Sequence, residues 1–317
     1  RDRIMQFAGI RVEQDFRETG EEYNILIRLA EDILTEPTAL MVTKITPQKT
    51  REDGVSEAEF VRIFSEKIAT PDTIFVGYNN VRFDDEHMRH TLWRNFRDPY
   101  AWAWKDGRGR WDILDAGRLV RALRPEGIVW PFVEHDGEKF AANKLELISA
   151  LNNFEHEHAH DALSDVRDTI EFARLLREKQ PKMFDFLLKI RDKNRVAELV
   201  GNGQPFVLAS GSVPAENLKT SVFVKIADAK NNKILAFDLR VSPTKFAKLT
   251  EEELLENLSA SWEKRQEKDF VALPIKEIAL NKCPAVAPLG TLDAPSQKRI
   301  NLSLADVKKH FLELEKS

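Results

Sequence analysis

The sequence lacks the features that mark several large classes of protein. A single cysteine, Cys283, among 317 residues excludes an internal disulfide framework and fits a reducing cytoplasm. No apolar run reaches the roughly 18 residues that a membrane-spanning helix needs, so we expect no membrane segment. No secretory signal is visible. The chain opens on Arg1 rather than Met, so we expect its natural start to lie further upstream.

An excess of charge of one sign is also missing. The chain has 48 Lys and Arg residues against 52 Asp and Glu residues, which gives a formal net charge of −4. A basic excess is the usual mark of a nucleic-acid-binding domain. Any such surface must therefore be a local patch. The hydrophobic content of 42% is that of an ordinary globular chain, and 317 residues suffice for about two domains.

Hydrophobic patterning predicts a layered α/β domain that ends near residue 180. Strands are expected at 5–12, 23–29 and 73–78, and the last of these is short and mostly apolar. Helices are expected from about Asp84 and near 56–64, 111–123, 143–152 and 160–178. Strands come first and helices alternate later, which favours a sheet covered by helices.

The predicted secondary structure changes after residue 180. Residues 181–204 are expected to form a helical connector, and residues 205–317 a small β-rich domain. Its predicted strands are 221–227, 233–241 and 270–278, with one helix near 250–267. Asn231 and Asn232 are typical of a tight hairpin turn.

The first candidate site residue is Asp84, which follows the predicted strand 73–78. Polar residues at the carboxyl end of a buried strand are where α/β folds usually bind ligands. The simpler interpretation is that Asp84 only caps the helix that follows it. Asn80, taken alone, is an ordinary turn residue.

The second candidate group lies at the start of the predicted helix 160–178. His160 stands directly before this helix and Asp165 lies one turn inside it. Carboxylates hold Mg²⁺ or Mn²⁺, and a histidine with a pKa near neutrality can take a proton from water. Each residue alone could be a surface group at a helix start. Together with Asp84, they indicate metal-assisted hydrolysis of a phosphodiester.

Several stretches together resemble a known family. They are 77–86 (GYNNVRFDDE), 98–102 (DPYAW), 110–112 (RWD), 122–127 (ALRPEG), 160–165 (HDALSD) and 281–284 (NKCP). The chain resembles the DEDD exonucleases with an RNase H-like fold, in the subclass that uses histidine as the base. Within that subclass, the chain closely resembles the bacterial exonuclease I family, and the resemblance covers essentially the whole chain.

The resemblance implies both a fold and a reaction. The fold would be an RNase H-like exonuclease domain, a mixed sheet flanked by helices, followed by an SH3-like domain. Asp84 and Asp165 match metal-binding aspartates, and His160 matches the general base. Two Mg²⁺ ions, with Mn²⁺ as a substitute, would assist removal of 5′-mononucleotides from the 3′ end of single-stranded DNA in DNA repair and recombination. We expect a cytoplasmic monomer.

The resemblance also implies that this chain is a fragment. The family carries an Asp-x-Glu pair on its first strand, and Arg1 stands where the segment after that strand should begin. Asp15 and Glu18 have the wrong spacing to replace the pair. The family's helical C-terminal domain is also expected to be missing. Two close divalent ions need several carboxylates, so we expect weak metal binding and little activity. Adding a first strand with Asp-x-Glu should restore hydrolysis.

Residues 93–111 are unusually rich in aromatic and basic side chains. They hold six aromatics and five Lys or Arg residues, far above the 9% aromatic content of the chain. Bases stack on aromatic rings and cations follow phosphates, which suits a single strand. The alternative is that about half of these rings fill the core. The predicted substrate contacts are Asn80, Phe83, Arg97, Tyr100, Trp102 and Arg108.

Two further features have competing interpretations. His156, His158 and His160 alternate as zinc ligands on a strand can, but they precede a helix, so we do not favour zinc. Arg124 is most simply a basic residue at a helix C-terminus. The resemblance implies that Arg124 also docks the acidic tail of single-stranded DNA-binding protein.

Three hypotheses about function follow. The leading one is a 3′→5′ exonuclease that acts on single-stranded DNA. The second is a 3′→5′ exoribonuclease of the same fold. The third is a non-catalytic nucleic-acid-binding module, which would bind substrate without turnover.

Overall fold

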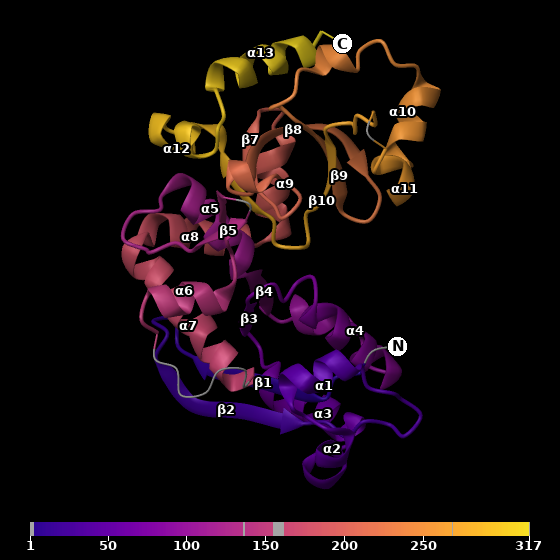
Figure 1. The fold of residues 1–317 in the computed structure, drawn as a ribbon. Coiled ribbons are helices and arrows are strands. Elements are labelled where there is room, and N and C mark those ends of the chain that lie inside the picture. The colour runs from indigo at the N-terminus through magenta and orange to yellow at the C-terminus, as the bar shows by residue number, and fades with distance from the viewer. Residues whose placement is uncertain (1–2, 136, 155–161, 268, 317) are drawn as a thin grey trace. The chain divides into compact units, whose positions relative to one another are not determined.

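The structure is a computed structural model that describes residues 3–135, 137–154, 162–267 and 269–316 (Figure 1). It divides into two compact units. Unit 1 consists of Arg1–Gly117 and Pro125–Leu188, and unit 2 of Arg118–Arg124 and Lys189–Ser317. Helix α5 (Ile113–Leu123) therefore contributes residues to both units.

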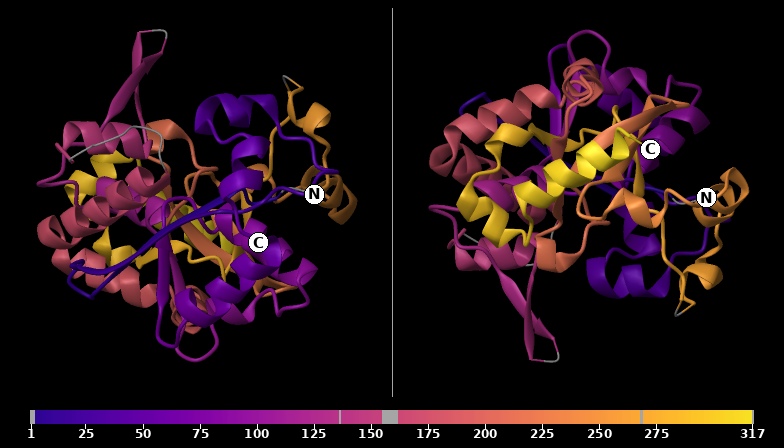
Figure 2. Two further views of the ribbon diagram at one scale, coloured as in Figure 1. Left: turned by 90° about the horizontal axis from the view of Figure 1, so that it is seen from below. Right: turned by 90° about the horizontal axis from the view of Figure 1, so that it is seen from above.

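The strands described in unit 1 form three separate pairs. They are the antiparallel pair β1 (Gln6–Val12) and β2 (Glu18–Leu26), the parallel pair β3 (Ile74–Gly77) and β4 (Gly109–Asp112), and the antiparallel hairpin β5 (Phe132–His135) and β6 (Glu138–Ala141). Figure 2 shows the β5–β6 hairpin extending away from the helices of its unit. Parallel and antiparallel pairing both occur, as a mixed α/β fold requires.

Some helices of unit 1 begin at a side-chain cap, and others begin without one. They are α1 (Pro37–Thr43), α2 (Pro47–Asp53), α3 (Glu57–Ile63), α4 (Asp84–Arg94), α6 (Leu145–Leu151), α7 (Ala162–Lys179) and α8 (Pro181–Ile190). Before α3, the Ser56 hydroxyl accepts a hydrogen bond from the Glu59 N–H at 3.1 Å. This cap satisfies a backbone donor that the helix itself cannot pair.

The core of unit 1 is built largely from aromatic rings. Phe60 and Phe64 of α3 and its continuation are fully buried, and the Phe64 ring lies 5.7 Å from Phe75 on β3. Trp102 joins this cluster, with its ring 5.0 Å from Phe75. Burial of each such ring contributes about 2–3 kcal/mol. The cluster therefore anchors β3, the strand that leads to Asp84.

Helix α7 follows the predicted amphipathic pattern. Leu163, Ile170 and Ala173 are buried, whereas Val166 is only partly so. Phe172 of the same helix packs so closely on Gly117 that a Cβ there would lie 2.8 Å from the ring. Only glycine permits this approach.

Unit 2 contains a five-stranded antiparallel sheet in the order β10-β9-β8-β7-β11. The strands are β7 (Phe206–Ala209), β8 (Thr220–Ala229), β9 (Lys233–Asp238), β10 (Ile275–Ala279) and β11 (Ala285–Pro288). Asn231 and Asn232 have φ of 63° and 58° and join β8 to β9 in the predicted tight turn. The strand predicted from residue 270 begins only at Ile275.

The helices of unit 2 are α9 (Lys193–Gly201), α10 (Glu251–Leu258), α11 (Trp262–Arg265), α12 (Ala294–Arg299) and α13 (Leu304–Leu314). The single helix predicted near 250–267 is two helices, because Ser261 caps a new start by accepting from the Lys264 N–H. Helices α8 and α9 occupy most of residues 181–204.

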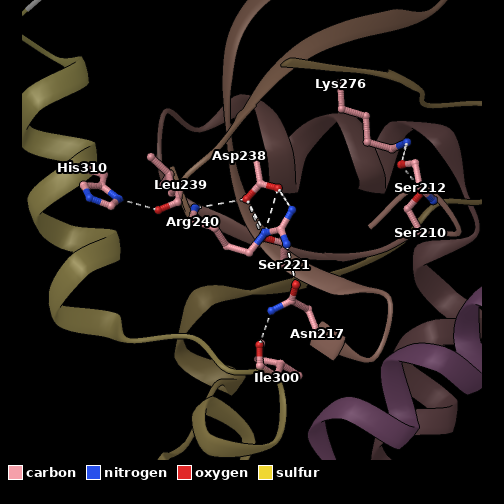
Figure 3. A network of polar contacts seen from close by, with 10 residues as sticks. All are labelled: Ser210, Ser212, Asn217, Ser221, Asp238, Leu239, Arg240, Lys276, Ile300 and His310. Atoms are coloured by element: carbon pink, nitrogen blue, oxygen red, sulfur yellow. Dashed lines mark hydrogen bonds and ion pairs between the residues drawn. The ribbon is translucent and has the colours of Figure 1, made fainter. Parts of the chain in front are cut away.

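A buried polar network ties β9 to its neighbours in unit 2 (Figure 3). The Asp238 carboxylate accepts from the Ser221 hydroxyl at 2.6 Å and from the Arg240 guanidinium at 2.5 Å. Arg240 also donates to the Asn217 side chain, which in turn donates to the Ile300 carbonyl at 2.8 Å. The network satisfies each of these groups and stabilises the unit.

Among the described residues, no helix combines the length and apolar character that crossing a membrane requires.

Candidate active site

The carboxyl ends of β3 and β4 lie side by side. In the parallel register, Gly77 at the end of β3 faces Asp112 at the end of β4. Residues 78–83 lead from β3 into α4, which begins at Asp84. The edge of a parallel pair is where α/β folds gather ligand-binding groups. Asp84 therefore stands where the sequence predicted a ligand site.

Asp112 holds the segment that precedes Asp84. Its buried carboxylate accepts hydrogen bonds from the Asn79 N–H at 2.9 Å, the Leu114 N–H at 3.0 Å and the Val81 N–H at 3.4 Å. Burial raises the pKa of Asp112 to about 6, although these donors oppose the rise. Three fixed N–H groups thus surround one poorly hydrated carboxyl.

A second contact from β4 holds the residue after Asp84. The Arg110 guanidinium donates to the Asp85 carboxylate, and both side chains are almost completely buried, with 8% and 3% of their surface exposed. Burial raises the pKa of Asp85 even though Arg110 acts in the opposite direction. A buried ion pair of this kind fixes the geometry of the two elements that carry it.

Asp84 lies between these two contacts with its side chain accessible to solvent. Protein atoms nevertheless crowd the other sides of its carboxyl, and this desolvation raises the pKa of Asp84, with a further rise from Asp85. Its own backbone N–H and His87 oppose the rise. Within the described part of the chain no basic side chain forms an ion pair with Asp84. An accessible, uncompensated carboxylate fits a divalent cation.

Two other predicted residues lie in the same segment. Asn80 is 8% exposed, and among the described residues its side-chain oxygen finds no hydrogen-bond partner. A Cβ at Gly77 would lie 2.7 Å from the Cβ of Asn80, so this close approach requires glycine. Phe83 is 61% exposed, and its ring centroid lies 4.6 Å from that of His87. Phe83 thus presents an apolar face next to Asp84.

The other half of the predicted site is only partly described. Asp165 lies in the first turn of α7 and is exposed. His160 lies outside the described residues, as do His156 and His158 of the alternative zinc site. Among the residues that the structure describes, no three His, Cys, Asp or Glu side chains gather as a metal site. The convergence of Asp84, His160 and Asp165 therefore stays a prediction.

The aromatic-rich segment 93–111 divides into buried and exposed rings. Trp93, Phe96, Tyr100 and Trp104 are 57–97% exposed, whereas Trp102 and Trp111 are 7% and 3% exposed. The Trp102 ring packs between Phe64 and Phe75, and its indole N–H donates to the Pro99 carbonyl at 3.0 Å. Trp102 has no face open to a base, so it is a core residue and we exclude it from the substrate contacts.

The basic residues of this segment also differ. Arg97 is exposed. Arg89, which precedes this segment on α4, has its guanidinium 5.3 Å from the centre of the Tyr100 ring. Arg108 instead turns inward, where it donates to the Ala69 carbonyl at 2.8 Å and pairs with Asp106 at 2.9 Å. Its side chain is 12% exposed, so Arg108 braces the loop and is not available for a phosphate.

Arg124 lies just past the C-terminus of α5. Its guanidinium donates to the Leu123 carbonyl at 2.6 Å and to the Thr291 carbonyl at 3.1 Å. It also forms an ion pair with Asp293 at 3.1 Å, in which the Arg124 side chain remains 36% exposed. An acidic ligand at Arg124 would therefore compete with Asp293.

Sequence reasoning gave no role to Arg110 or Asp112. Both lie on one face of β4, two residues apart, and contact the segment that carries Asp84. The available signal was weak, because Asp112 ends a short strand, GRWD, in which Trp111 is the one large apolar residue. What the sequence could not supply was the β3–β4 register that brings them together.

The structure and the sequence match known proteins along the whole chain. Residues 1–173 match the family described as Exonuclease, and residues 191–317 match the Exonuclease I SH3-like domain. Exodeoxyribonuclease I of Haemophilus influenzae is 37% identical over 305 residues, which are 95% of this chain and 64% of that protein. The chain thus spans less than two thirds of this relative.

Two solved structures are similar throughout. The zinc-bound form of the Escherichia coli exonuclease I complex with single-stranded DNA is 36% identical, with a TM-score of 0.92, over 100% of this chain and 67% of that one. An exonuclease I complex with SSB-Ct is 35% identical, with a TM-score of 0.91, over 99% and 67%. The predicted fold, an exonuclease domain followed by an SH3-like domain, is confirmed. The chain belongs to the exonuclease I family.

Proposed function

We propose that this chain is the exonuclease and SH3-like part of an enzyme that hydrolyses single-stranded DNA from its 3′ end and releases 5′-mononucleotides. The observation that carries the proposal is Asp84, an accessible carboxylate at the end of a parallel strand pair, crowded by protein and without a basic partner in the described chain. Membership of the exonuclease I family gives this carboxylate its chemical context. We place the connector between the two domains at residues 181–204.

The metal would be held first by the carboxylates of Asp84 and Asp165. Mg²⁺ prefers carboxylate oxygens, and Mn²⁺ accepts the same ligands. When bound, such ions lower the pKa of water and stabilise charge on the departing oxygen. The related Escherichia coli structure holds zinc, which supports divalent-metal chemistry in this family. We propose two Mg²⁺ ions in the active enzyme.

His160 is the proposed general base. Its ordinary pKa lies close to working pH, so a neutral imidazole can take the proton of the attacking water. Asp84, as a metal ligand, would act through its carboxylate oxygens, whereas the proton of the attacking water would pass to His160. The aspartates would therefore bind the metal, and His160 would take the proton.

The proposed strand-binding surface combines exposed rings with an exposed cation. Phe83 lies next to Asp84, and Tyr100 and Arg97 lie in the aromatic segment. Trp93, Phe96 and Trp104 extend the exposed aromatic surface. Each base stacked on such a ring contributes about 1–3 kcal/mol of binding. Stacking tolerates any base, as an exonuclease requires.

A partner site at Arg124 is the second part of the proposal. The related complex with SSB-Ct supports docking of the acidic tail of single-stranded DNA-binding protein. Arg124 keeps part of its guanidinium exposed although Asp293 pairs with it. An Asp293→Asn variant should therefore bind an acidic C-terminal peptide more tightly, as measured by fluorescence anisotropy. Weaker or unchanged binding would count against Arg124 as the docking residue.

The function is tested with a single-stranded oligonucleotide labelled at its 5′ end. With the chain in excess over DNA, we expect slow Mg²⁺-dependent shortening from the 3′ end, release of 5′-mononucleotides, and no reaction with EDTA. Asp84→Asn should remove this activity. Binding of the oligonucleotide without any shortening would favour the non-catalytic module. Faster digestion of a matched RNA would favour the exoribonuclease.

A second experiment tests the metal site without relying on activity. Mn²⁺ bound to the chain is counted by electron paramagnetic resonance, and we expect Asp84→Asn and Asp165→Asn each to weaken binding. Competition by Mg²⁺ should displace the Mn²⁺. If neither substitution changes Mn²⁺ binding, these aspartates are not the ligands and the proposed mechanism is wrong.

A further inference from the structure

We propose that Asp112 is a positioning residue, which fixes the Asp84 carboxylate in its metal-binding geometry by holding the backbone that leads to it. The inference rests on the proposed function of Asp84. Asp112 itself would not touch metal or substrate.

Two hydrogen bonds of Asp112 hold the backbone that leads to Asp84. Asn79 and Val81 are five and three residues before Asp84, and both donate their backbone N–H to the Asp112 carboxylate. The Leu114 N–H donates to the same carboxylate, so it also fixes the start of α5. A loop held by hydrogen bonds to its backbone keeps its path whatever its side chains do.

The chain is held on both sides of Asp84. Before Asp84, the Val81 N–H donates to the Asp112 carboxylate. Directly after Asp84, Asp85 forms the buried ion pair with Arg110. Asp112 and Arg110 belong to the same short strand, β4. A rigid strand therefore sets the position of a residue that lies at the start of a helix. Metal ligands need such support from residues behind them.

The segment between β3 and Asp84 is tightly constrained. Asn79 has a φ of 65°, a left-handed conformation that asparagine tolerates better than most residues. The side chain of Asn80 packs closely on Gly77. Without the Asp112 carboxylate, the N–H groups of this constrained turn would lose their acceptors. The turn would then relax, and Asp84 would move with it.

The test is Asp112→Asn. The amide oxygen can still accept from Asn79 and Leu114, which share one oxygen of Asp112, but the amide NH₂ then faces the Val81 N–H. We expect Mn²⁺ binding to weaken about tenfold, the scale seen when groups supporting metal ligands are altered. For single-stranded DNA, kcat should fall more than KM rises, since Asp112 lies behind the metal site.

Asp238→Asn is the matched control. Asp238 is as buried as Asp112 and also accepts a backbone N–H, but it lies in unit 2. It should lower the melting temperature and leave Mn²⁺ affinity unchanged. If Asp238→Asn weakens Mn²⁺ binding as much as Asp112→Asn, general destabilisation explains both, and the positioning role is overturned.

A double-mutant cycle separates this inference from the proposed function. If Asp112 acts through Asp84, then adding Asp112→Asn to Asp84→Asn should cause no further loss of Mn²⁺ binding. Losses that simply add would overturn the positioning role. If Asp84→Asn weakens Mn²⁺ binding and Asp112→Asn does not, Asp84 stands as a ligand and the inference fails alone. If Asp84→Asn has no effect, the proposed function fails first.

Discussion

Asp112 in unit 1 and Asp238 in unit 2 are buried equally, at 7% and 6% exposure, but they are stabilised differently. Two nitrogens of the Arg240 guanidinium donate to the Asp238 carboxylate, which also accepts from the Ser221 hydroxyl. Within the described chain, the Asp112 carboxylate accepts only from backbone N–H groups, and the charge of Asp115 raises its pKa further. We infer that Asp238 stabilises unit 2, whereas Asp112 holds a loop in unit 1.

The largest expected effect comes from the buried ion pair beside the site. Arg110→Ala leaves the Asp85 carboxylate buried without its cation, which should lower the free energy of unfolding by about 3–5 kcal/mol. Arg240→Ala in unit 2 should cost less, because the Arg240 side chain is 22% exposed and Asp238 keeps Ser221. Urea titrations of the two variants make the comparison. An equal or larger loss for Arg240→Ala would contradict it.

The next effect is a pH dependence from Asp112. Its folded pKa of about 6 lies above its ordinary value of 3.8, so the folded chain binds more protons than the unfolded chain between pH 4 and 6. Stability contributed by this carboxyl is therefore present at low pH and is lost as pH rises through 6, by about 3 kcal/mol.

Asp112→Asn removes this titration, so its unfolding free energy should change less between pH 4 and 6 than that of the parent chain. Asp84 and Asp85 have pKa values raised in the same direction and remain in both proteins. The difference between the two denaturation curves isolates Asp112. Identical pH profiles would show that the Asp112 carboxyl is not desolvated.

A smaller effect is expected at the glycine that faces Asp112. Gly77→Ala puts a Cβ 2.7 Å from Asn80, so the loop must shift, at a cost of about 2 kcal/mol. Mn²⁺ binding should weaken with it. Gly201→Ala in α9 meets no atom within 4 Å and is the matched control, with unchanged Mn²⁺ binding and no loss of stability. Thermal unfolding with and without Mn²⁺ measures both. An unaffected Gly77→Ala variant would mean that the loop is not tightly held.

The smallest expected effect lies in the hairpin of unit 2. Asn232 has a φ of 58°, and glycine adopts this conformation without strain, so Asn232→Gly should raise stability by about 0.5 kcal/mol. Metal binding should stay as it was. A melting temperature below that of the parent chain would show that the Asn232 side chain contributes more than its backbone conformation.

Local signals in the sequence predicted the elements on either side of Asp84, but not β4, whose last two residues were expected in a helix. The apolar stretch before Asp84, the helix that begins there and the asparagine turn before β9 all depend on neighbouring residues, and the structure has each of them. The break between α10 and α11 was missed, since a capping serine inside a polar stretch looks like any other serine. The short strands β5 and β6 carry little periodicity and were missed as well.

Features that depend on contacts between distant parts of the chain could not be predicted from the sequence. Trp102 and Trp104 are two residues apart in one aromatic run, yet one fills the core and the other is exposed, because Phe64 and Phe75 happen to lie beside only the first. Asp112 acquires its contacts from a strand register that joins segments more than 30 residues apart. Neither outcome follows from periodicity or motif spacing.

The proposed metal-binding role of Asp84 is tested most directly by a crystal structure of the chain soaked with Mn²⁺, with the ion located by its anomalous signal. We expect an ion bonded to the Asp84 carboxylate, with Asp165 as a further ligand and the Asp112 carboxylate turned away toward the backbone of Val81. An ion bound elsewhere, with Asp84 and Asp165 facing different regions of solvent, would contradict it.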